Sequence, residues 1–260
     1  MATQGLVDPA SAFSVRKIGL DAPWDWLARG FHQFKRAPGI ALAYGSLILI
    51  GSYLLTAGLW WAGLTAWIPA LAGGFLILGP LFAVGLYDAS MRLDRNETPR
   101  LEQICQLDRE SGLQLLYVGF LLSFLYLIWM RVAMLLYAAF LDGQYYPFSS
   151  FIAHMLTTSN GLALVTVGTV IGAGIAFTAF AVSAISIPML IGQRVDFGTA
   201  ILASLETVRV NWAPMLLWAW LIAIFTAIAM ATAFLGLVFV FPLIGFATWQ
   251  AYRDLIEPPA

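Results

Sequence analysis

The chain has 260 residues but a single cysteine, Cys105, and only two histidines, His32 and His154. One cysteine can build neither a disulfide framework nor a thiolate metal cluster. The two histidines fall on opposite sides of the membrane in the threading below, so they cannot ligate one haem or one metal. We therefore expect no cofactor. The alternative is a soft copper site near the outer surface, built from Met130, Met134, His154 and Met155.

Charged residues are also scarce, and they make up only 10% of the chain. Soluble domains are about a quarter charged. Residues 37–87 and 210–252 contain no Asp, Glu, Lys or Arg, and each stretch is long enough for two crossings of about 20 residues. This pattern excludes a soluble domain and predicts an all-α, polytopic membrane protein. Its six expected transmembrane helices are residues 39–60, 68–90, 113–141, 162–191, 213–233 and 235–252.

Basic residues lie on one side of this threading, and Arg131 is the single exception. The positive-inside bias makes that side cytoplasmic, and an even number of crossings returns both termini to it. The opposite loops are Trp61–Trp67, Asp142–Gly161 and a turn near Ala233–Gly236, and none contains Lys or Arg. We therefore expect a bacterial inner-membrane protein with cytoplasmic termini. The formal net charge of −1 points to no nucleic-acid partner.

The start of the chain is charged and amphipathic, which is not the pattern of a cleavable signal. We expect residues 1–14 to form a disordered tail and residues 15–256 to form one transmembrane domain. The domain divides into three repeated units, at about residues 20–92, 98–194 and 196–254. Each unit joins a cytoplasmic amphipathic segment to a hairpin through the membrane.

A proline recurs in the cytoplasmic half of the second helix of each hairpin. Proline removes a helical hydrogen bond and usually kinks the helix. The three expected kinks are at Pro80, Pro188 and Pro242. The alternative explanation is that proline is simply common in membrane helices.

The amphipathic segments of the first and third units begin at good N-cap residues, Asp21 and Asp196. The middle segment, which Thr98 would cap, is weaker. The first segment has an apolar stripe of Leu20, Trp24, Leu27, Phe31 and Phe34, and an opposite face of Asp25, Arg29, His32, Gln33 and Arg36. Such helices lie in the headgroup layer; the alternative is a docking surface for a partner. Residues 148–156 predict a further short helix on the outer surface.

Arg131 is the only basic residue inside a crossing, and an intramembrane charge is a functional hypothesis by default. It would bind a lipid headgroup or another anion, or else snorkel toward the outer surface as an anchor. Gly168, Gly172 and Ala176 form a row of small residues that packs helices within the bundle or forms a dimer seam. Asp88 and Arg92 are expected to pair at a helix end.

The segment Trp24-Asp25-Trp26-Leu27-Ala28-Arg29-Gly30, the stretch from Gly79-Pro80-Leu81 to Tyr87-Asp88 and the six crossings resemble a known family. It is a domain-of-unknown-function family of predicted bacterial integral inner-membrane proteins. The likeness extends over roughly residues 15–255. Some members carry the label of cytochrome c oxidase subunits, but the crossings of this chain lack histidines for haem or copper.

No catalytic motif occurs in the sequence, so we expect a non-enzymatic protein in contact with membrane lipids. The first hypothesis is an accessory, assembly or scaffold subunit of an inner-membrane complex, with respiratory complexes included because of the resemblance. The alternative is a transporter or lipid-handling protein for an apolar or amphipathic small molecule, since the crossings offer little polar lining. An intramembrane enzyme comes third.

Overall fold

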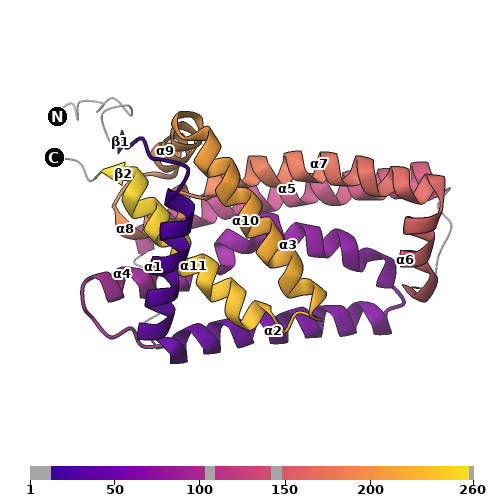
Figure 1. The fold of residues 1–260 in the computed structure, drawn as a ribbon, viewed down its shortest axis with the longest axis horizontal. Helices are drawn as coiled ribbons and strands as arrows, with labels where there is room; N and C mark the ends of the chain where they lie inside the picture. The colour runs from indigo at the N-terminus through magenta and orange to yellow at the C-terminus, as the bar shows by residue number, and fades with distance from the viewer. Residues whose placement is uncertain (1–12, 103–108, 142–147, 258–260) are drawn as a thin grey trace.

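The computed structural model describes residues 13–102, 109–141 and 148–257, and they form a bundle of helices. The elements are β1 (Ser14–Val15), α1 (Ala22–Arg36), α2 (Pro38–Trp61), η2 (Thr65–Trp67), α3 (Ile68–Phe82), α4 (Val84–Asp94), α5 (Arg109–Leu141), α6 (Phe148–Thr157), α7 (Ser159–Ser183), α8 (Ser186–Gly192), α9 (Phe197–Val210), α10 (Trp212–Ala231), α11 (Leu237–Leu255) and β2 (Ile256–Glu257). Figure 1 shows α2, α3, α5 and α7 running along the long axis, with α1 lying across one end and α6 at the other.

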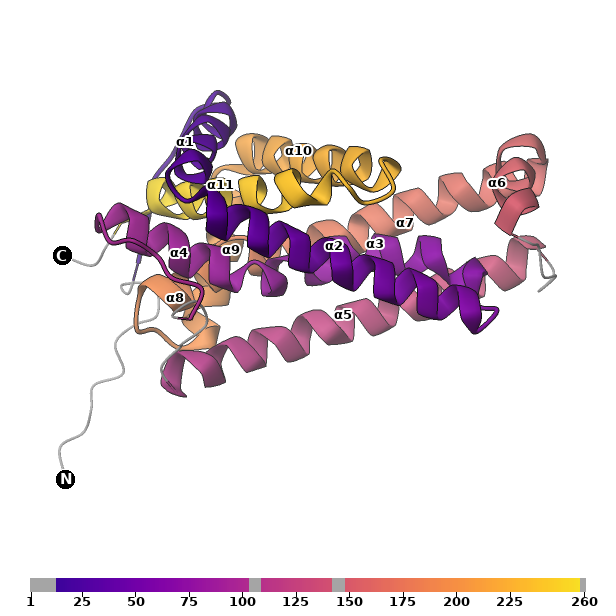
Figure 2. The same cartoon turned by 90° about the horizontal axis from the view of Figure 1, so that it is seen from below.

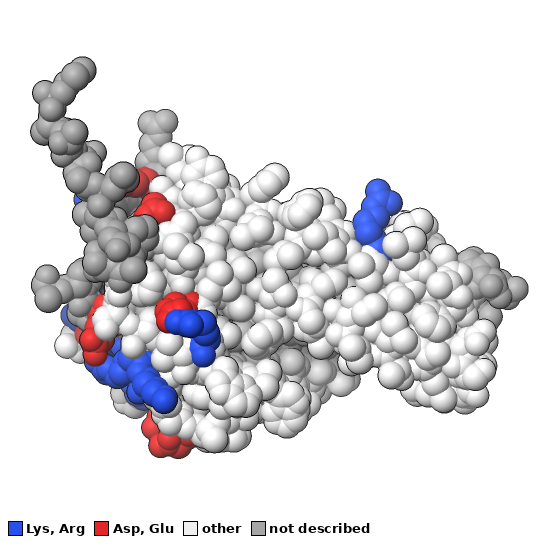
Figure 3. Space-filling view, turned by 90° about the horizontal axis from the view of Figure 1, so that it is seen from above, with Lys and Arg blue, Asp and Glu red and all other residues white. Residues whose placement is uncertain are grey.

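The two ends of the bundle differ in charge. On the face drawn in Figure 3, nearly all acidic and basic side chains gather at one end, and the rest is uncharged except for one basic group. We call the end that carries α1, α4, α8, α9 and the two strands the charged end, and the end that carries η2 and α6 the far end (Figure 1). The separation of charge along the long axis is the arrangement expected of a bundle that stands in a membrane.

Within the described ranges, five helices are long and apolar enough to cross a membrane, rather than the six expected. They are Pro38–Trp61, Ala70–Asp94, Glu110–Leu141, Ser159–Gly192 and Trp212–Ala231. The sixth expected crossing, residues 235–252, corresponds to α11 and is not among them. Its C-terminal half carries polar side chains, including Thr248 and Gln250, which are buried against the surrounding helices instead of facing lipid.

The turn between α10 and α11 stops short of the far ends of α2 and α7, as Figures 1 and 2 both show. Free backbone groups in an apolar environment need a hydrogen-bond partner. The Tyr53 hydroxyl of α2 donates to the Ala233 carbonyl over 2.8 Å, and the Gly236 amide donates to the Thr232 hydroxyl over 2.9 Å. The Tyr53 and Thr232 hydroxyls therefore provide hydrogen-bond partners for these backbone groups of the turn. It was expected in an outer loop, but it lies along the bundle beside α2.

Both ends of the described chain meet at the charged end. β1 and β2 pair as an antiparallel ladder, with Ser14 opposite Glu257 and Val15 opposite Ile256. Asn211, which precedes α10, fastens the same segment, because it accepts from the Ile18 amide and donates to the Arg16 carbonyl. α11 thus returns the chain to the end where it began.

α1 presents two apolar faces. Leu20, Trp24 and Phe31 of the expected stripe point outward and are more than half exposed, whereas Trp26 is fully buried.

Gly30 lies against α11, where a Cβ atom would come within 2.9 Å of Ala247, so only glycine allows this approach. α1 ends at Ala37 because the following residue is Pro38, which disfavours helical geometry in the residue before it.

Two of the three proline-bearing helices are interrupted. α3 and α4 divide at Ala83, three residues after Pro80, and α7 and α8 divide four residues before Pro188. α11 continues through Pro242 without a break. At the second interruption the Ser204 hydroxyl of α9 donates to the Ala181 carbonyl over 2.7 Å and accepts from the Ile185 amide over 3.2 Å. A side chain from a neighbouring helix therefore replaces bonds that the break removes.

The core lies toward the charged end and surrounds α11. Trp26 of α1 and Trp218 of α10 meet edge to face with ring centroids 5.6 Å apart. Leu86 of α4 and Phe246 of α11 are fully buried beside them. Large aromatic side chains that pack in this geometry contribute more than their buried area alone. α11 is thus the central helix of the packed part of the molecule.

Other expectations can be placed directly. The short helix predicted at residues 148–156 is confirmed as α6. Asp196 caps α9 as expected, because its carboxylate accepts from the Thr199 amide over 3.0 Å, but the Asp21 side chain makes no capping bond to α1. In the middle segment, Leu101 lies in a turn and not in a helix, whereas Ile104 and Cys105 lie outside the described residues. Most of the expected tail, residues 1–12, also lies outside them.

Candidate functional site

A groove of about 830 Å³ is lined by residues of α2 and α5 and by Leu81, Phe82 and Val84 at the junction of α3 and α4. Leu116 and Phe120 on its rim are 67% and 77% exposed, so the groove opens sideways to the surroundings of the bundle. The lining residues are Tyr44, Leu47, Ile48, Leu81, Phe82, Val84, Gly112, Leu115, Leu116, Gly119, Phe120 and Ser123.

Two glycines of α5 leave the room for this groove. Gly112 and Gly119 are seven residues apart, which places them on the same side of a helix. A Cβ atom at Gly112 would meet nothing within 4 Å, and one at Gly119 would make ordinary contact with Leu81 at 3.6 Å. Larger side chains at these positions would therefore project into the groove without disturbing the backbone.

The chemistry of the groove is that of a binding surface for an apolar group. Among the described residues that line it, the polar side chains are those of Tyr44 and Ser123, and none is Asp, Glu, Lys, Arg or His. A hydrocarbon chain fits this surface, because its transfer needs no polar partner.

The polar groups are concentrated instead at the charged end, where Asp94 of α4 joins three helices. Its carboxylate accepts from Gln33 of α1 over 2.9 Å, from the indole of Trp249 over 2.8 Å and from Arg253 over 2.7 Å, the last two on α11. Gln33 was expected on the outward polar face of α1. It is buried, and its amide oxygen also accepts a hydrogen bond from the Ser90 hydroxyl of α4.

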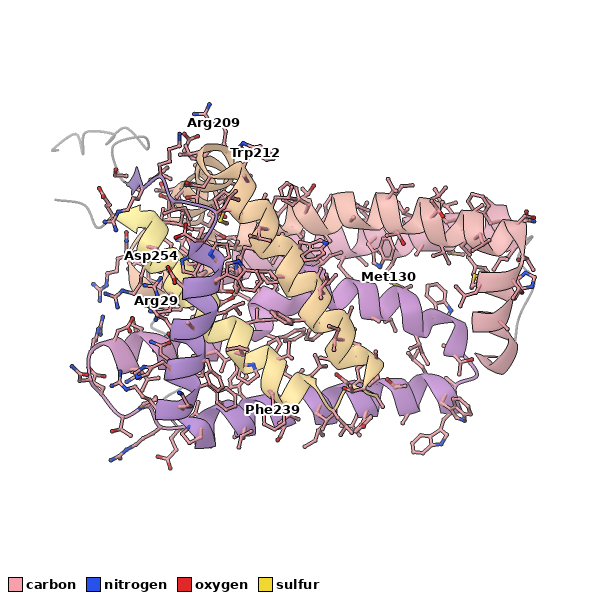
Figure 4. The ribbon with its side chains drawn as sticks, in the orientation of Figure 1. Arg29, Met130, Arg209, Trp212, Phe239 and Asp254 are labelled. Atoms are coloured by element: carbon pink, nitrogen blue, oxygen red, sulfur yellow. The ribbon has the colours of Figure 1, made fainter. Side chains whose placement is uncertain are left out.

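A second carboxylate, Asp254 of α11, repeats this pattern toward α1. It accepts from the Trp26 indole over 2.9 Å and from both terminal nitrogens of Arg29, one of them at 2.9 Å. Figure 4 shows Arg29 and Asp254 side by side. The hydrogen bond to Asp254 raises the pKa of the Arg29 guanidinium above its ordinary value. Arg29, expected to face outward, therefore holds α1 against α11.

The expected pairing of Asp88 and Arg92 is confirmed, with 2.9 Å between carboxylate and guanidinium within α4. Arg92 also approaches Glu97, at 3.8 Å, so the Asp88 carboxylate forms part of a helix-end ion pair.

Arg131 lies exposed on α5, and it makes no hydrogen bond or ion pair with the residues that the structure describes. Met130, the residue before it, is labelled in Figure 4 in the half of the bundle away from the charged end. Asp142, a candidate partner in sequence terms, lies outside the described residues. The structure therefore brings Arg131 together with no other candidate site residue.

The row of small residues on α7 meets α5. A Cβ atom at Gly172 would lie 2.8 Å from the Trp129 ring, and one at Gly168 would lie 3.9 Å from Leu136. Trp129 also donates its indole N–H to the Ala70 carbonyl of α3 over 2.7 Å. Trp129 thus wedges between α3 and α7, with Gly172 providing the space, while Ala176 is half-buried one turn further along.

Metal ligands are dispersed in the described part of the chain. It contains no group of three or more His, Cys, Asp and Glu side chains that could hold a metal ion. His32 lies on α1 and His154 on α6, at opposite ends of the bundle (Figure 1). No residue set described here is arranged to hold a haem or another prosthetic group.

Residues 67–192 match a family described as "Predicted integral membrane protein (DUF2189)". The match covers just under half of the chain, from the start of α3 to α8. It includes Gly79-Pro80-Leu81 and Tyr87-Asp88 of the expected resemblance, but not the Trp24–Gly30 segment. The comparison with curated proteins found no match, and neither did the comparison with solved structures. The chain is an integral membrane protein with several membrane-spanning helices, similar in this region to that family.

Sequence reasoning missed the groove and the two carboxylates that join helices at the charged end. The Gly112–Gly119 spacing on α5 was an available signal for the groove, but it needs a facing helix before it has meaning. The two Trp–Asp–Arg contacts had no signal, because each aspartate lies more than 150 positions in sequence from its tryptophan and its arginine.

Proposed function

We propose that this protein is a non-enzymatic lipid-handling membrane protein that binds an acyl chain, or another apolar or amphipathic small molecule, in the groove between α2 and α5. The observation that carries the proposal is the uncharged, laterally open groove of about 830 Å³. Its volume lies within the range of about 300–1,000 Å³ that is usual for small-molecule sites.

The length of the groove supports an acyl chain as the occupant. Its α5 wall runs from Gly112 to Ser123, eleven residues that rise by about 17 Å in a helix. The hydrocarbon core of a bilayer is about 30 Å thick, so one leaflet is about half of that. A chain that enters sideways from one leaflet would therefore find a groove of matching length.

The proposed orientation has the charged end in the cytoplasm of a bacterium, with the protein in its inner membrane. The support is the distribution of basic residues, which the positive-inside bias assigns to the cytoplasmic side. Reporter fusions after residue 144 and at the C-terminus test it. Reporters that behave as periplasmic and cytoplasmic, respectively, support the orientation, and the reverse result contradicts it.

A groove-filling variant tests the binding function. Gly119→Leu projects into the groove, and Gly174→Leu is the matched control, because Gly174 lies exposed on α7, outside the groove lining, with nothing within 4 Å of a Cβ atom. The purified protein is labelled with a photoreactive C16 fatty acid and digested. We expect labelled peptides from α2 and α5, at least fivefold weaker labelling in Gly119→Leu, and unchanged labelling in Gly174→Leu. Equal labelling of all three proteins contradicts the proposal.

A second candidate function is an accessory, assembly or scaffold subunit of an inner-membrane complex, with respiratory complexes included. It is favoured by the small buried share of the most apolar windows of α2 and α5, 17% and 11%. A photocrosslinker at Leu54 of α2 or Leu135 of α5, both strongly exposed, tests it. One protein captured at a constant near-equimolar ratio supports a subunit role, whereas crosslinks to lipid alone contradict it.

A further inference from the structure

Arg131 stands on the same face of α5 as the wall of the groove. The residues Leu116, Phe120, Leu127 and Arg131 are all exposed, and each follows the one before it by four, seven and four positions in turn. Residues at these spacings lie on the same side of a helix. Arg131 is eight residues beyond Ser123, about 12 Å further toward the far end. The Cα–Cβ bonds of a helix tilt toward its N-terminus, which in α5 is the direction of the groove.

The described part of the protein offers this guanidinium no counter-charge. Arg131 makes no ion pair there, and Glu110, the only acidic residue of α5, lies 21 residues away, or about 31 Å along the helix. A charge on an apolar helix surface is costly in lipid unless an opposite charge or water reaches it. A planar guanidinium pairs best with a carboxylate or a phosphate.

We propose that the occupant of the groove carries an anionic head and that Arg131 binds this head. The ligand class is an acyl chain that ends in a carboxylate or a phosphate group, with its chain along Leu116 and Phe120 and its head toward the far end. Arg131 thereby determines specificity for anionic over neutral amphiphiles. This inference rests on the proposed acyl-chain function and adds the head group to it.

Matched ligands that differ only in the head group test the inference. Binding of palmitate, its neutral analogue hexadecanol and a C16 lysophosphatidic acid is measured with the full-length protein in nanodiscs of neutral lipid. We expect the wild type to bind at least one anionic ligand about tenfold more tightly than hexadecanol. Arg131→Gln should remove this preference by weakening the anionic ligands alone, and Arg131→Lys should keep part of it. Whichever anionic ligand binds more tightly identifies the head group.

The outcomes separate the two proposals. If the three ligands bind the wild type and Arg131→Gln alters none of them, the role of Arg131 is wrong while acyl-chain binding stands. If no ligand binds the wild type, or if all bind Gly119→Leu unchanged, both proposals fail. Thermal unfolding of each variant shows whether it is folded, and Arg131 has no described contact whose loss would unfold the protein.

Discussion

The charged end and the grooved half of the bundle are held together by different means. At the charged end, Asp94 and Asp254 each accept from one tryptophan and one arginine, and these bonds cross between helices. Along the groove, α2 and α5 face each other across an apolar space instead. The difference teaches that specific polar contacts position the helices at the charged end, whereas apolar side chains that leave a space between them line the groove.

The largest expected effect comes from breaking the charged end. Asp94→Ala removes the acceptor for Gln33, Trp249 and Arg253 at once. Hydrogen bonds to charged groups contribute strongly, and the buried side chains of Gln33 and Trp249 would both lose this acceptor, so we expect a loss of about 3 kcal/mol in the free energy of unfolding.

The measurement is the midpoint of thermal or SDS-induced unfolding in detergent. Glu206→Ala is the control, because the Glu206–Arg209 pair lies within one turn of α9 on the surface and should leave the midpoint unchanged. Equal midpoints for Asp94→Ala and the wild type would show that the charged end does not hold the fold.

A smaller effect is expected where α2 packs against α11 beside the groove. A Cβ atom at Gly45 would overlap the Val238 carbonyl and lie 2.7 Å from its Cα atom, whereas Gly51 on the same helix has open space. Overpacking against rigid backbone costs about 1–3 kcal/mol, so Gly45→Ala should lose about 2 kcal/mol.

Gly51→Ala is the matched control, and it should be neutral or slightly stabilising because alanine favours helix. The same unfolding midpoints compare the two variants. If they behave alike, the close approach of α2 to α11 does not shape the wall of the groove.

The smallest expected effect concerns the start of α9. Hydrogen bonds from the Thr199 hydroxyl and amide lower the pKa of the Asp196 carboxyl below its ordinary value. Asp196→Ala should cost about 1 kcal/mol, as is typical for the loss of an N-cap.

The pH dependence of this effect follows from the lowered pKa. The contribution of Asp196 is fully present above the unfolded-state pKa of about 3.9 and disappears as the pH falls through the lower folded-state pKa. Unfolding midpoints of the wild type and Asp196→Ala should therefore differ at neutral pH and converge in acid. Asp21→Ala is the control and should have no effect, since Asp21 makes no capping bond. A pH-independent difference would mean that the cap acts without its charge.

Much of the fold follows from local pattern. The uncharged runs predict α2, α5 and α10 within a few residues, because a helix in lipid must satisfy its own backbone bonds over a length set by the bilayer. The helix expected at residues 162–191 is divided into α7 and α8. Asp196 is recognisable as a cap because its hydrogen bond joins two residues that are only three positions apart in sequence. The crossing expected at α11 is not confirmed, because its apolar half resembles lipid-facing sequence whereas its polar half is buried against other helices.

The candidate site could be predicted only in part. Arg131 is conspicuous in sequence, since a lone charge in an apolar run needs no neighbour to be noticed. The groove is not conspicuous in sequence, because it consists of the space between two helices. The apolar side chains that line it are of the same kinds as those elsewhere in the chain. Gln33 and Arg29 were placed on an outward face by helical periodicity, which cannot tell solvent from a neighbouring carboxylate.

The sequence by itself determined that the protein resides in a membrane and that its charge lies on one side of it, because hydropathy and charge act residue by residue against the bilayer. The tertiary structure alone decided that α11 is the central helix, that the α10–α11 turn stops short of the far end, and that α2 and α5 leave a groove between them. These features depend on contacts between residues far apart in the chain, such as Tyr53 with Ala233 and Asp94 with Arg253, which no local pattern encodes.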